Sequence, residues 1–342
     1  MADDIIVPLR SPTAPISGLP ELQAHVEALS NDPSSPPTQS SSTKLTIPYP
    51  DQNIRPLIPI LLPRLAQLLK TQTEHDPSPL LSLSIKLISP LSLAQALTFA
   101  DRTSLLNALR SPLPAANLLA LAIVGKAASS PAEAERLAEL PDIVTELLRL
   151  WLGSPDVGVG EGAARVLARV LETDCSSAEV VNGTGHEPRP PGRGRIWPII
   201  LEDDDNLALI RHLCTLGHDP CRLTYDVTIS QGRLLRLLPT LAALDMQPLT
   251  AETGQGLLQW AALSMVDTSD TLMHLSLVDF YESLVGSMRQ SRHARDATVK
   301  SLVNKAARED SAVNNALRTL ADRVEDDDDA PDVRNYVAYL LS

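Results

Sequence analysis

Residues 151–174 constrain the fold more than any other part of the sequence, because they hold a helix end, a tight corner and a new helix. Gly153 can adopt the left-handed conformation that ends a helix, and Ser154-Pro155-Asp156 then provides a cap and a first-turn proline for the next one. Apolar residues follow at helical spacing. They are Val159, Ala163, Ala164, Leu167, Val170 and Leu171. A single helix pair of this kind cannot bury both of its faces, so the corner predicts a stack of further helices.

Apolar residues recur at helical spacing along most of the remaining chain, in segments separated by short loops marked by Ser-Pro or Leu-Pro. No alternating strand pattern appears among them, so consecutive helices are expected to be antiparallel neighbours. Proline removes a backbone donor, and Pro56, Pro59 and Pro63 therefore place the first long regular helix after Pro63. Later helices are predicted at about residues 79–88, 91–109, 114–128, 132–139, 142–152, 157–173, 202–216, 228–244, 250–265, 269–289, 296–308, 311–324 and 332–341.

The corner resembles the second half of a HEAT or armadillo repeat. We therefore predict an all-α armadillo/HEAT-type α-solenoid, in which antiparallel helix pairs form a right-handed superhelix. We expect residues 1–50 to form an extended arm with one short helix at 19–29 and a Ser/Pro linker. N-terminal helical repeats are expected over 51–174 and C-terminal helical repeats over 199–342. Between them, Gly, Pro and Arg replace the apolar pattern, so we expect a disordered or exposed loop over 175–198.

Composition narrows the class of protein. The 342 residues are 44% hydrophobic and 21% charged, as in ordinary soluble globular proteins. Aromatic residues make up only 3%, so aliphatic contacts between helices are expected rather than an aromatic-lined cavity for a small molecule. The formal charge of −13 opposes the binding of phosphate backbones and favours basic protein partners. Direct nucleic-acid binding is therefore not expected.

The cysteines and the apolar runs indicate the compartment. Cys175, Cys214 and Cys221 are too few and too irregularly spaced for a disulfide framework, and reduced thiols fit a cytoplasmic or nuclear protein. The first residues lack a charged leader followed by an apolar run, and no run of about 18 apolar residues occurs. We expect a soluble protein with no membrane partner that is monomeric when free.

Two stretches are similar to cofactor or metal motifs but depart from the required pattern. Gly158, Gly160 and Gly162 imitate a dinucleotide-binding loop, yet no strand precedes them and Ala163 stands where the third glycine belongs. Residues 202–205 are similar to half of the aspartate-rich magnesium motif of all-α prenyl-transferring enzymes, whose second half is absent here. No nucleophile elbow, phosphate loop or zinc-protease motif occurs, so we expect no catalytic residue and no cofactor.

Three further groups have a structural and a functional interpretation. His212, Cys214, His218 and Cys221 have the residue types of a zinc site but not its common spacings, and single buried Cys and His are ordinary, so no metal is expected. The acidic run at 325–329 is interpreted as a solvated loop, with contact to a basic partner as the alternative. In the long loop, the basic side chains are interpreted as solubilising charges rather than as a nucleic-acid patch. They are Arg189, Arg193 and Arg195.

Two runs of the sequence resemble a known family. The first extends from Ile229 to Met246 and the second from Gly256 to Val285. Both are similar to the fungal branch of the proteasome non-ATPase subunit 5 family, and the corner at 155–167 is compatible with it. Members of this family are assembly chaperones of the 26S proteasome regulatory particle, and the fungal members also carry an older label as DNA mismatch-repair proteins.

The resemblance implies a curved armadillo/HEAT solenoid that holds the C-terminal helical domain of one AAA+ ATPase subunit during assembly of the regulatory-particle base and then leaves. It implies no catalytic residue. This chain departs from the family in a short, Cys-containing stretch at 217–227 and in ending near Ser342, which would omit the family's last repeats. The alternatives are a mismatch-repair or chromatin-associated scaffold, which should show a basic stripe, and an all-α metal-dependent enzyme.

Polar positions on the helices expected to line the concave surface are the candidate partner-binding residues. On the helix at 228–244, Arg233 and Arg236 face away from part of the leucine stripe. On the helix at 269–289, Ser276, Asp279 and Ser283 form a polar line at spacings of three and four. The alternative is that these side chains are ordinary solvent-facing residues with intramolecular partners.

Overall fold

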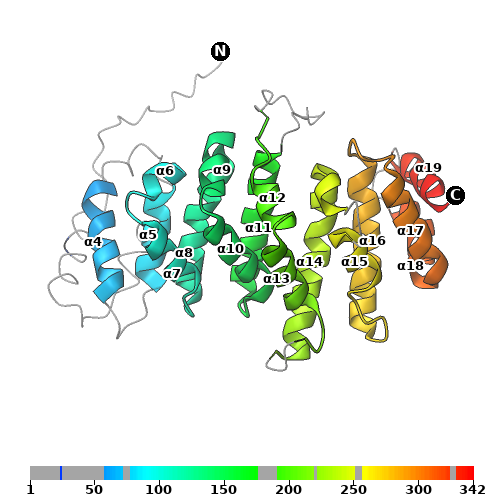
Figure 1. Ribbon diagram of the computed structural model, residues 1–342, viewed down its shortest axis with the longest axis horizontal. Helices are drawn as coiled ribbons and strands as arrows, with labels where there is room; N and C mark the ends of the chain where they lie inside the picture. The colour runs from blue at the N-terminus through cyan, green and yellow to red at the C-terminus, as the bar shows by residue number, and fades with distance from the viewer. Residues whose placement is uncertain are drawn as a thin grey trace, which may run out of the picture. The chain divides into compact units, whose positions relative to one another are not determined.

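The computed structural model describes residues 58–71, 78–175, 191–218, 222–250, 256–323 and 329–342, together with Ala24. These ranges contain α-helices and short 3-10 helices and no β-strand, which confirms the all-α class for the described part of the chain (Figure 1). Of the expected arm, short helix and linker at 1–50, only Ala24 is described, and it is helical. The chain divides into two compact units, Met1–Lys126 and Ala127–Ser342.

The helices of the first unit pack mainly on α5 and α8. Helix α5 lies against α4 and α8, and α7 also lies against α8. Asn117 of α8 joins two of them, because its side-chain amide donates to the carbonyl groups of Ala108 and Leu109 at the end of α7, each at 2.9 Å. The helices are α4 (Ile58–Thr71), α5 (Ser78–Ile88), α6 (Leu93–Ala96), α7 (Arg102–Leu109) and α8 (Pro114–Val124), followed by a 3-10 turn at Gly125–Ser129.

Two predictions for the first unit are wrong in detail. The helix expected at 91–109 is divided into α6 and α7, because Ser92 caps α6 and Asp101 caps α7 with side-chain hydrogen bonds. Regular helix also begins before Pro63, which lies inside α4. Pro63 has no N–H group, so the carbonyl group of Pro59 lacks its intrahelical donor. Both prolines are exposed, so this carbonyl group faces water.

The second unit holds most of the described helices. They are α9 (Pro131–Ala138), α10 (Pro141–Gly153), α11 (Val157–Asp174), α12 (Ile196–Leu201), α13 (Asp204–Cys214), α14 (Thr224–Leu244), α15 (Leu257–Leu263), α16 (Thr271–Arg289), α17 (Ala297–Glu309), α18 (Ser311–Thr319) and α19 (Ala330–Leu341). The helices predicted at 142–152, 157–173, 269–289 and 296–308 are confirmed to within two residues.

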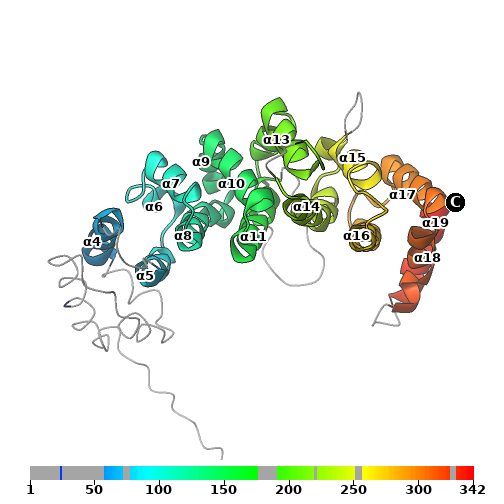
Figure 2. The same cartoon turned by 90° about the horizontal axis from the view of Figure 1, so that it is seen from below.

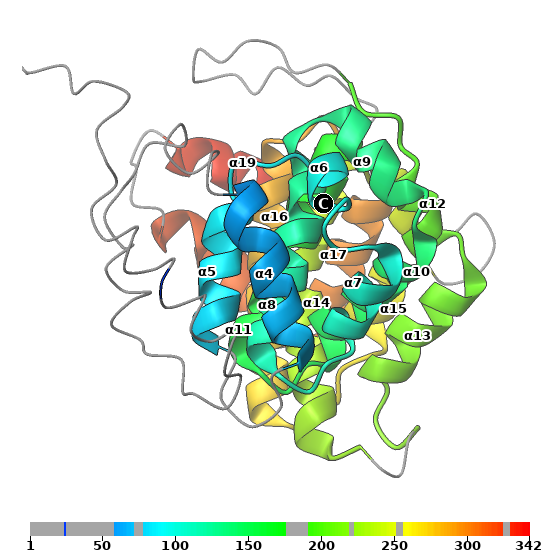
Figure 3. The same cartoon turned by 90° about the vertical axis from the view of Figure 1, so that its left-hand side faces the viewer.

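Within this unit the helices form two rows. Figure 2 shows α11, α14 and α16 in one row and α10, α13 and α15 in the other. Helix α14 contacts α11 and α16 in its own row, and α10, α13 and α15 in the opposite row. The view in Figure 3 places α10, α13 and α15 together on one side of α14. This stacking of antiparallel neighbours is compatible with an α-solenoid.

Helix α14 joins the two rows through polar side chains that are fully buried. The Gln231 side-chain amide donates to the carbonyl groups of Cys214 at 2.8 Å and Met265 at 2.9 Å, which lie at the ends of α13 and α15. The Ser230 hydroxyl donates to the carbonyl group of Leu152 in α10, at 2.6 Å. Carbonyl groups at helix ends lack an intrahelical donor, so these bonds satisfy groups whose burial would otherwise be unfavourable.

The segment after α11 differs from the prediction. Of the expected loop at 175–198, Cys175 and residues 191–198 are described, and the end of this range forms the start of α12, whose apolar residues show no clear period. The buried Asp174 carboxylate accepts a hydrogen bond from the Ile196 amide at 2.6 Å and so fixes the start of this helix. Burial raises the pKa of Asp174, although backbone hydrogen bonds oppose the shift. Residues 176–190 lie outside the described ranges.

Several other helices in the second unit are shorter or longer than predicted. Helix α14 begins at Thr224, one turn before the predicted start at 228. Helix α15 covers only Leu257–Leu263 of the predicted 250–265. Residues 320–323 form a 3-10 turn in place of the last part of the helix expected at 311–324. Within the described ranges, no helix has the length and apolar character needed to cross a membrane.

Substitution of Leu167 by Asp tests the packing of the second unit. Leu167 lies on the buried stripe of α11 and is only 1% exposed. Because the change buries an unpaired carboxylate, we expect Leu167→Asp to lower the free energy of unfolding by at least about 3 kcal/mol. Chemical denaturation should show this loss, and the control Arg165→Asp, an exposed position on the same helix, should unfold within about 0.5 kcal/mol of the wild type. Equal midpoints for the two variants would show that α11 is peripheral.

Candidate partner-binding groove

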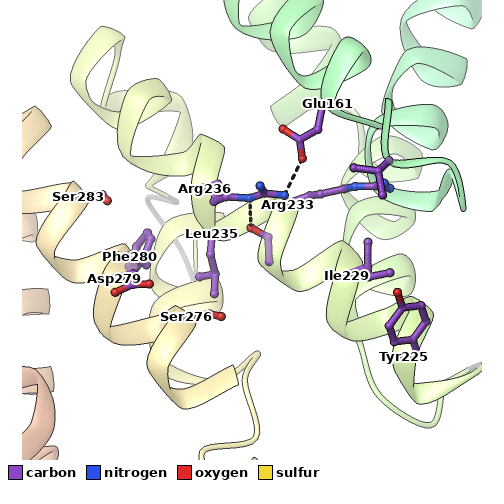
Figure 4. Close-up of a pocket in the computed structure, with 12 residues that line it drawn as sticks. Glu161, Tyr225, Ile229, Arg233, Leu235, Arg236, Ser276, Asp279, Phe280 and Ser283 are labelled. Atoms are coloured by element: carbon purple, nitrogen blue, oxygen red, sulfur yellow. Dashed lines mark hydrogen bonds and ion pairs between the residues drawn. The ribbon is translucent and has the colours of Figure 1, made fainter. Parts of the chain in front are cut away.

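All five candidate partner-binding residues line one groove formed by α11, α14 and α16 (Figure 4). The groove has a volume of about 370 Å³. Its lining residues are Val157, Glu161, Tyr225, Ile229, Gly232, Arg233, Leu235, Arg236, Ser276, Asp279, Phe280 and Ser283. The structure therefore brings together the two polar lines that the sequence placed on separate helices.

Helical spacing explains how α16 contributes to the groove. Ser276, Asp279 and Ser283 are separated by three and four residues, so they share one face of the helix. The opposite face holds Leu277 and Tyr281, which are buried. Because α16 packs against α14, the polar face of α16 lies beside the outward face of α14 that carries Arg236 (Figure 4).

Arg233 differs from the prediction, which placed it on an exposed face. Its side chain is only 3% exposed, and its guanidinium donates to the carbonyl groups of Ser154 at 2.7 Å and Asp156 at 3.3 Å. These groups form the corner between α10 and α11. Burial lowers the pKa of Arg233, although the Glu161 carboxylate opposes the shift. Arg233 is thus a structural link between helices, and its expected exposure is wrong.

A glycine on α11 provides the space for Arg233. A Cβ atom at Gly160 would lie 2.2 Å from the Arg233 guanidinium carbon, closer than any real contact between these atoms. The glycine run at 158–162 lies within α11, and the segment before α11 is another helix. The N-cap of α11 is Asp156, whose carboxylate accepts a hydrogen bond from the Val159 amide at 2.8 Å. The run therefore serves helix packing, and not the phosphate-binding loop whose pattern it imitates.

Arg236 and Glu161 form an ion pair across the groove. The Arg236 guanidinium lies 2.7 Å from the Glu161 carboxylate, and the two side chains are 66% and 40% exposed. Surface pairs of this kind contribute at most about 1 kcal/mol to stability, because water and salt screen them. Either side chain can therefore exchange its present partner for another at little cost.

Asp279 is the groove's remaining charge. It is exposed, and it makes no hydrogen bond or salt bridge with any residue that the structure describes. The nearby Arg323 guanidinium is bound to Glu282 on the same helix, through a short contact and a second one of 3.1 Å. Among the serines, Ser276 donates to the Leu272 carbonyl group at 3.0 Å, and Ser283 is exposed.

Sequence reasoning missed the apolar part of this surface. Val157 and Tyr225 line the groove and are largely exposed. On α16, Leu272 and Leu275 are also largely exposed. The signal that could have found these exposed residues is their position in the sequence. Three of them lie in the first turn of a helix, and Leu275 lies only a turn further along α16.

The residues considered for zinc are not arranged as a site. Cys214 is fully buried, and burial raises the pKa of its thiol to about 12, whereas a zinc ligand is a thiolate. His212 and His218 contact each other edge to face with ring centroids 4.8 Å apart. Cys221 lies outside the described residues. In the described ranges, no group of three or more His, Cys, Asp or Glu side chains is placed to hold a metal ion.

The acidic and basic runs have structural partners where they are described. In the run at 202–205, Asp203 caps α13 by accepting from the Asn206 amide at 2.9 Å. Arg193 and Arg195 both contact Glu135 of α9, at 2.5 and 3.1 Å. From the second acidic run only Asp329 is described, and it pairs with Arg289 at 2.9 Å. Arg189 and residues 325–328 lie outside the described ranges.

Substitution of Gly160 by Ala tests the link made by Arg233. Alanine is normally favoured over glycine inside a helix by about 1 kcal/mol. Here the new methyl group would displace the buried guanidinium, so we expect Gly160→Ala to lower the free energy of unfolding by about 2 kcal/mol. Chemical denaturation should also show that Gly286→Ala on α16, where the methyl group meets nothing within 4 Å, leaves stability equal or higher. A stabilising effect of Gly160→Ala would contradict the proposed link.

Comparisons with known proteins add no family assignment. No protein-family model matches this sequence, and no curated protein matches it significantly. The two runs that resemble the chaperone family, residues 229–246 and 256–285, form α14, α15 and most of α16. The function is therefore inferred from the groove and from these runs.

Proposed function

We propose that the protein is a non-catalytic assembly chaperone that binds the C-terminal domain of a AAA+ ATPase subunit during assembly of the 26S proteasome regulatory-particle base. One observation carries this proposal. The two runs that resemble the chaperone family supply α14 and α16, and the five polar positions singled out on those helices all line a single groove. The proposed role corresponds to a protein of the cytoplasm and nucleus that is monomeric when free.

We also propose that the helix pairs form a right-handed solenoid of the armadillo/HEAT type. The sharp corner at 153–157 and the two rows of helices in the second unit support this architecture. Solenoids of this kind hold folded domains on the surface lined by one helix from each pair. The row of α11, α14 and α16 that forms the groove corresponds to that surface.

The chemistry of the groove suits a protein domain better than a small molecule. Its charged groups, Glu161, Arg236 and Asp279, are exposed and carry both signs. Small-molecule sites instead enclose the ligand with apolar and aromatic side chains and a few precisely placed polar groups. The overall charge of −13 would speed the approach of a partner with a basic surface and suppress acidic competitors.

A pull-down with each proteasomal ATPase C-terminal domain tests this function. We expect the wild type to capture one of the domains, and the double variant Arg236→Glu, Asp279→Lys to capture that domain at least about tenfold more weakly, because it reverses both exposed charges at the centre of the groove. Its melting temperature should stay within about 2 °C of the wild type, since a surface ion pair contributes little to stability.

The control is Lys305→Glu, which reverses an exposed charge on α17, outside the groove. It should capture the domain as well as the wild type. Failure of the wild type to capture any of the domains would disprove the chaperone assignment. Equal capture by the wild type and the double variant would disprove only the role of the groove.

A further inference from the structure

Large apolar side chains are exposed near the N-terminal ends of the helices that form the groove. They are more than half exposed, from 56% for Leu275 to 72% for Leu272. The others are Val157, Leu223 and Tyr225. Single exposed apolar residues are ordinary on a protein surface, but a cluster marks a site that another surface covers.

The N-terminal ends of three neighbouring helices carry these side chains. Val157 is the first residue of α11, Tyr225 is the second residue of α14, and Leu272 is the second residue of α16. These helices lie side by side in one row, and all three begin at the lower edge of Figure 1. Val157 and Tyr225 line the groove itself, and Leu272 lies one turn before Ser276 on the same face.

The rest of the groove differs from these apolar helix ends because it carries charged side chains. The Arg236 side chain is paired with Glu161, and Arg323 is paired with Glu282. Asp279 therefore makes no hydrogen bond or ion pair with a described residue, although it interacts electrostatically with Arg323. Asp279 lies seven residues after Leu272 on the same helix, which corresponds to two turns and about 10 Å along its axis. The surface therefore offers an apolar contact and an unpaired negative charge about 10 Å apart.

We infer that this surface, consisting of Val157, Tyr225, Leu272 and Asp279, is a docking site for one amphipathic helix that carries a large apolar residue and a Lys or Arg seven positions apart. Residues seven apart lie on one face of a helix and span the same distance as Leu272 and Asp279. The apolar side chain would pack among Val157, Tyr225 and Leu272, and the cation would pair with Asp279. That the docked helix belongs to the ATPase domain rests on the proposed function. The residues that the docked helix must carry are inferred from the surface alone.

A helix fits this surface better than the other occupants. The groove runs between parallel helical ridges, which receive the side chains of another helix. A peptide that binds by strand addition would need a free sheet edge, and the described ranges contain no strand. A second copy of the chain would bring together two molecules that each carry a formal charge of −13.

Binding of synthetic helical peptides to the full-length protein, measured by fluorescence anisotropy, tests this inference. The first peptide carries Leu and Lys seven positions apart, the second replaces Lys with Glu, and the third replaces Leu with Ser. We expect the first peptide to bind at least about tenfold more tightly than either of the others. Asp279→Lys should reverse the preference between Lys and Glu, and the double variant Tyr225→Ser, Leu272→Ser should weaken binding of the first peptide at least about tenfold.

Leu113→Ser is the matched control, because it replaces an exposed leucine at the start of α8 that is not among the residues lining the groove. It should bind the peptides as the wild type does. Equal binding of the three peptides, or no binding, would overturn the docking site. A wild-type dimer in sedimentation that Leu272→Ser dissociates would assign the surface to self-association instead.

The two proposals fail in different ways. Capture of an ATPase domain without discrimination among the peptides would contradict the docking site and leave the chaperone function intact. Discrimination among the peptides without capture of any ATPase domain would contradict the chaperone function alone.

Discussion

The second unit depends on buried side chains of α14 that satisfy carbonyl groups at the ends of neighbouring helices. A helix end leaves carbonyl groups without donors, and a stack of short helices buries many such ends. Gln231 donates to the ends of α13 and α15, Ser230 donates to α10, and Arg233 donates to the corner before α11. One helix therefore bonds the ends of helices in both rows, and Gly160 leaves the space that Arg233 requires.

The same constraint positions the groove. Arg233 of α14 is held against the corner before α11. Arg236 lies one turn further along α14, where it contacts Glu161 and faces solvent. Helix α16 packs on the other side of α14 and contributes Asp279. The arrangement thus combines an interior in which buried side chains of α14 bond neighbouring helix ends with a surface of weakly held charges and exposed apolar first turns. Under the proposed function, this surface would bind a domain and later release it.

Much of this arrangement follows from local sequence rules. The corner at 153–157 was predictable, because a cap and a proline act within one turn, although Gly153 closes α10 without a positive φ and Pro155 precedes the Asp156 N-cap of α11. The burial of Arg233 was not, since it depends on a missing Cβ atom on a helix more than 70 positions away. Helix α12 was missed because a short apolar run carries no period. The exposure of Leu272 was missed because apolar spacing alone does not show where neighbouring helices end.

Hydrogen exchange in Gln231→Leu tests most directly whether α14 holds the neighbouring helix ends. Leucine has a similar size but no donor, so the carbonyl groups of Cys214 and Met265 would both lose their partner. We expect the last turns of α13 and α15 to exchange their amides faster together, while the protection of α5 and α8 in the first unit stays as in the wild type. Unchanged protection of both turns in the variant would contradict the account.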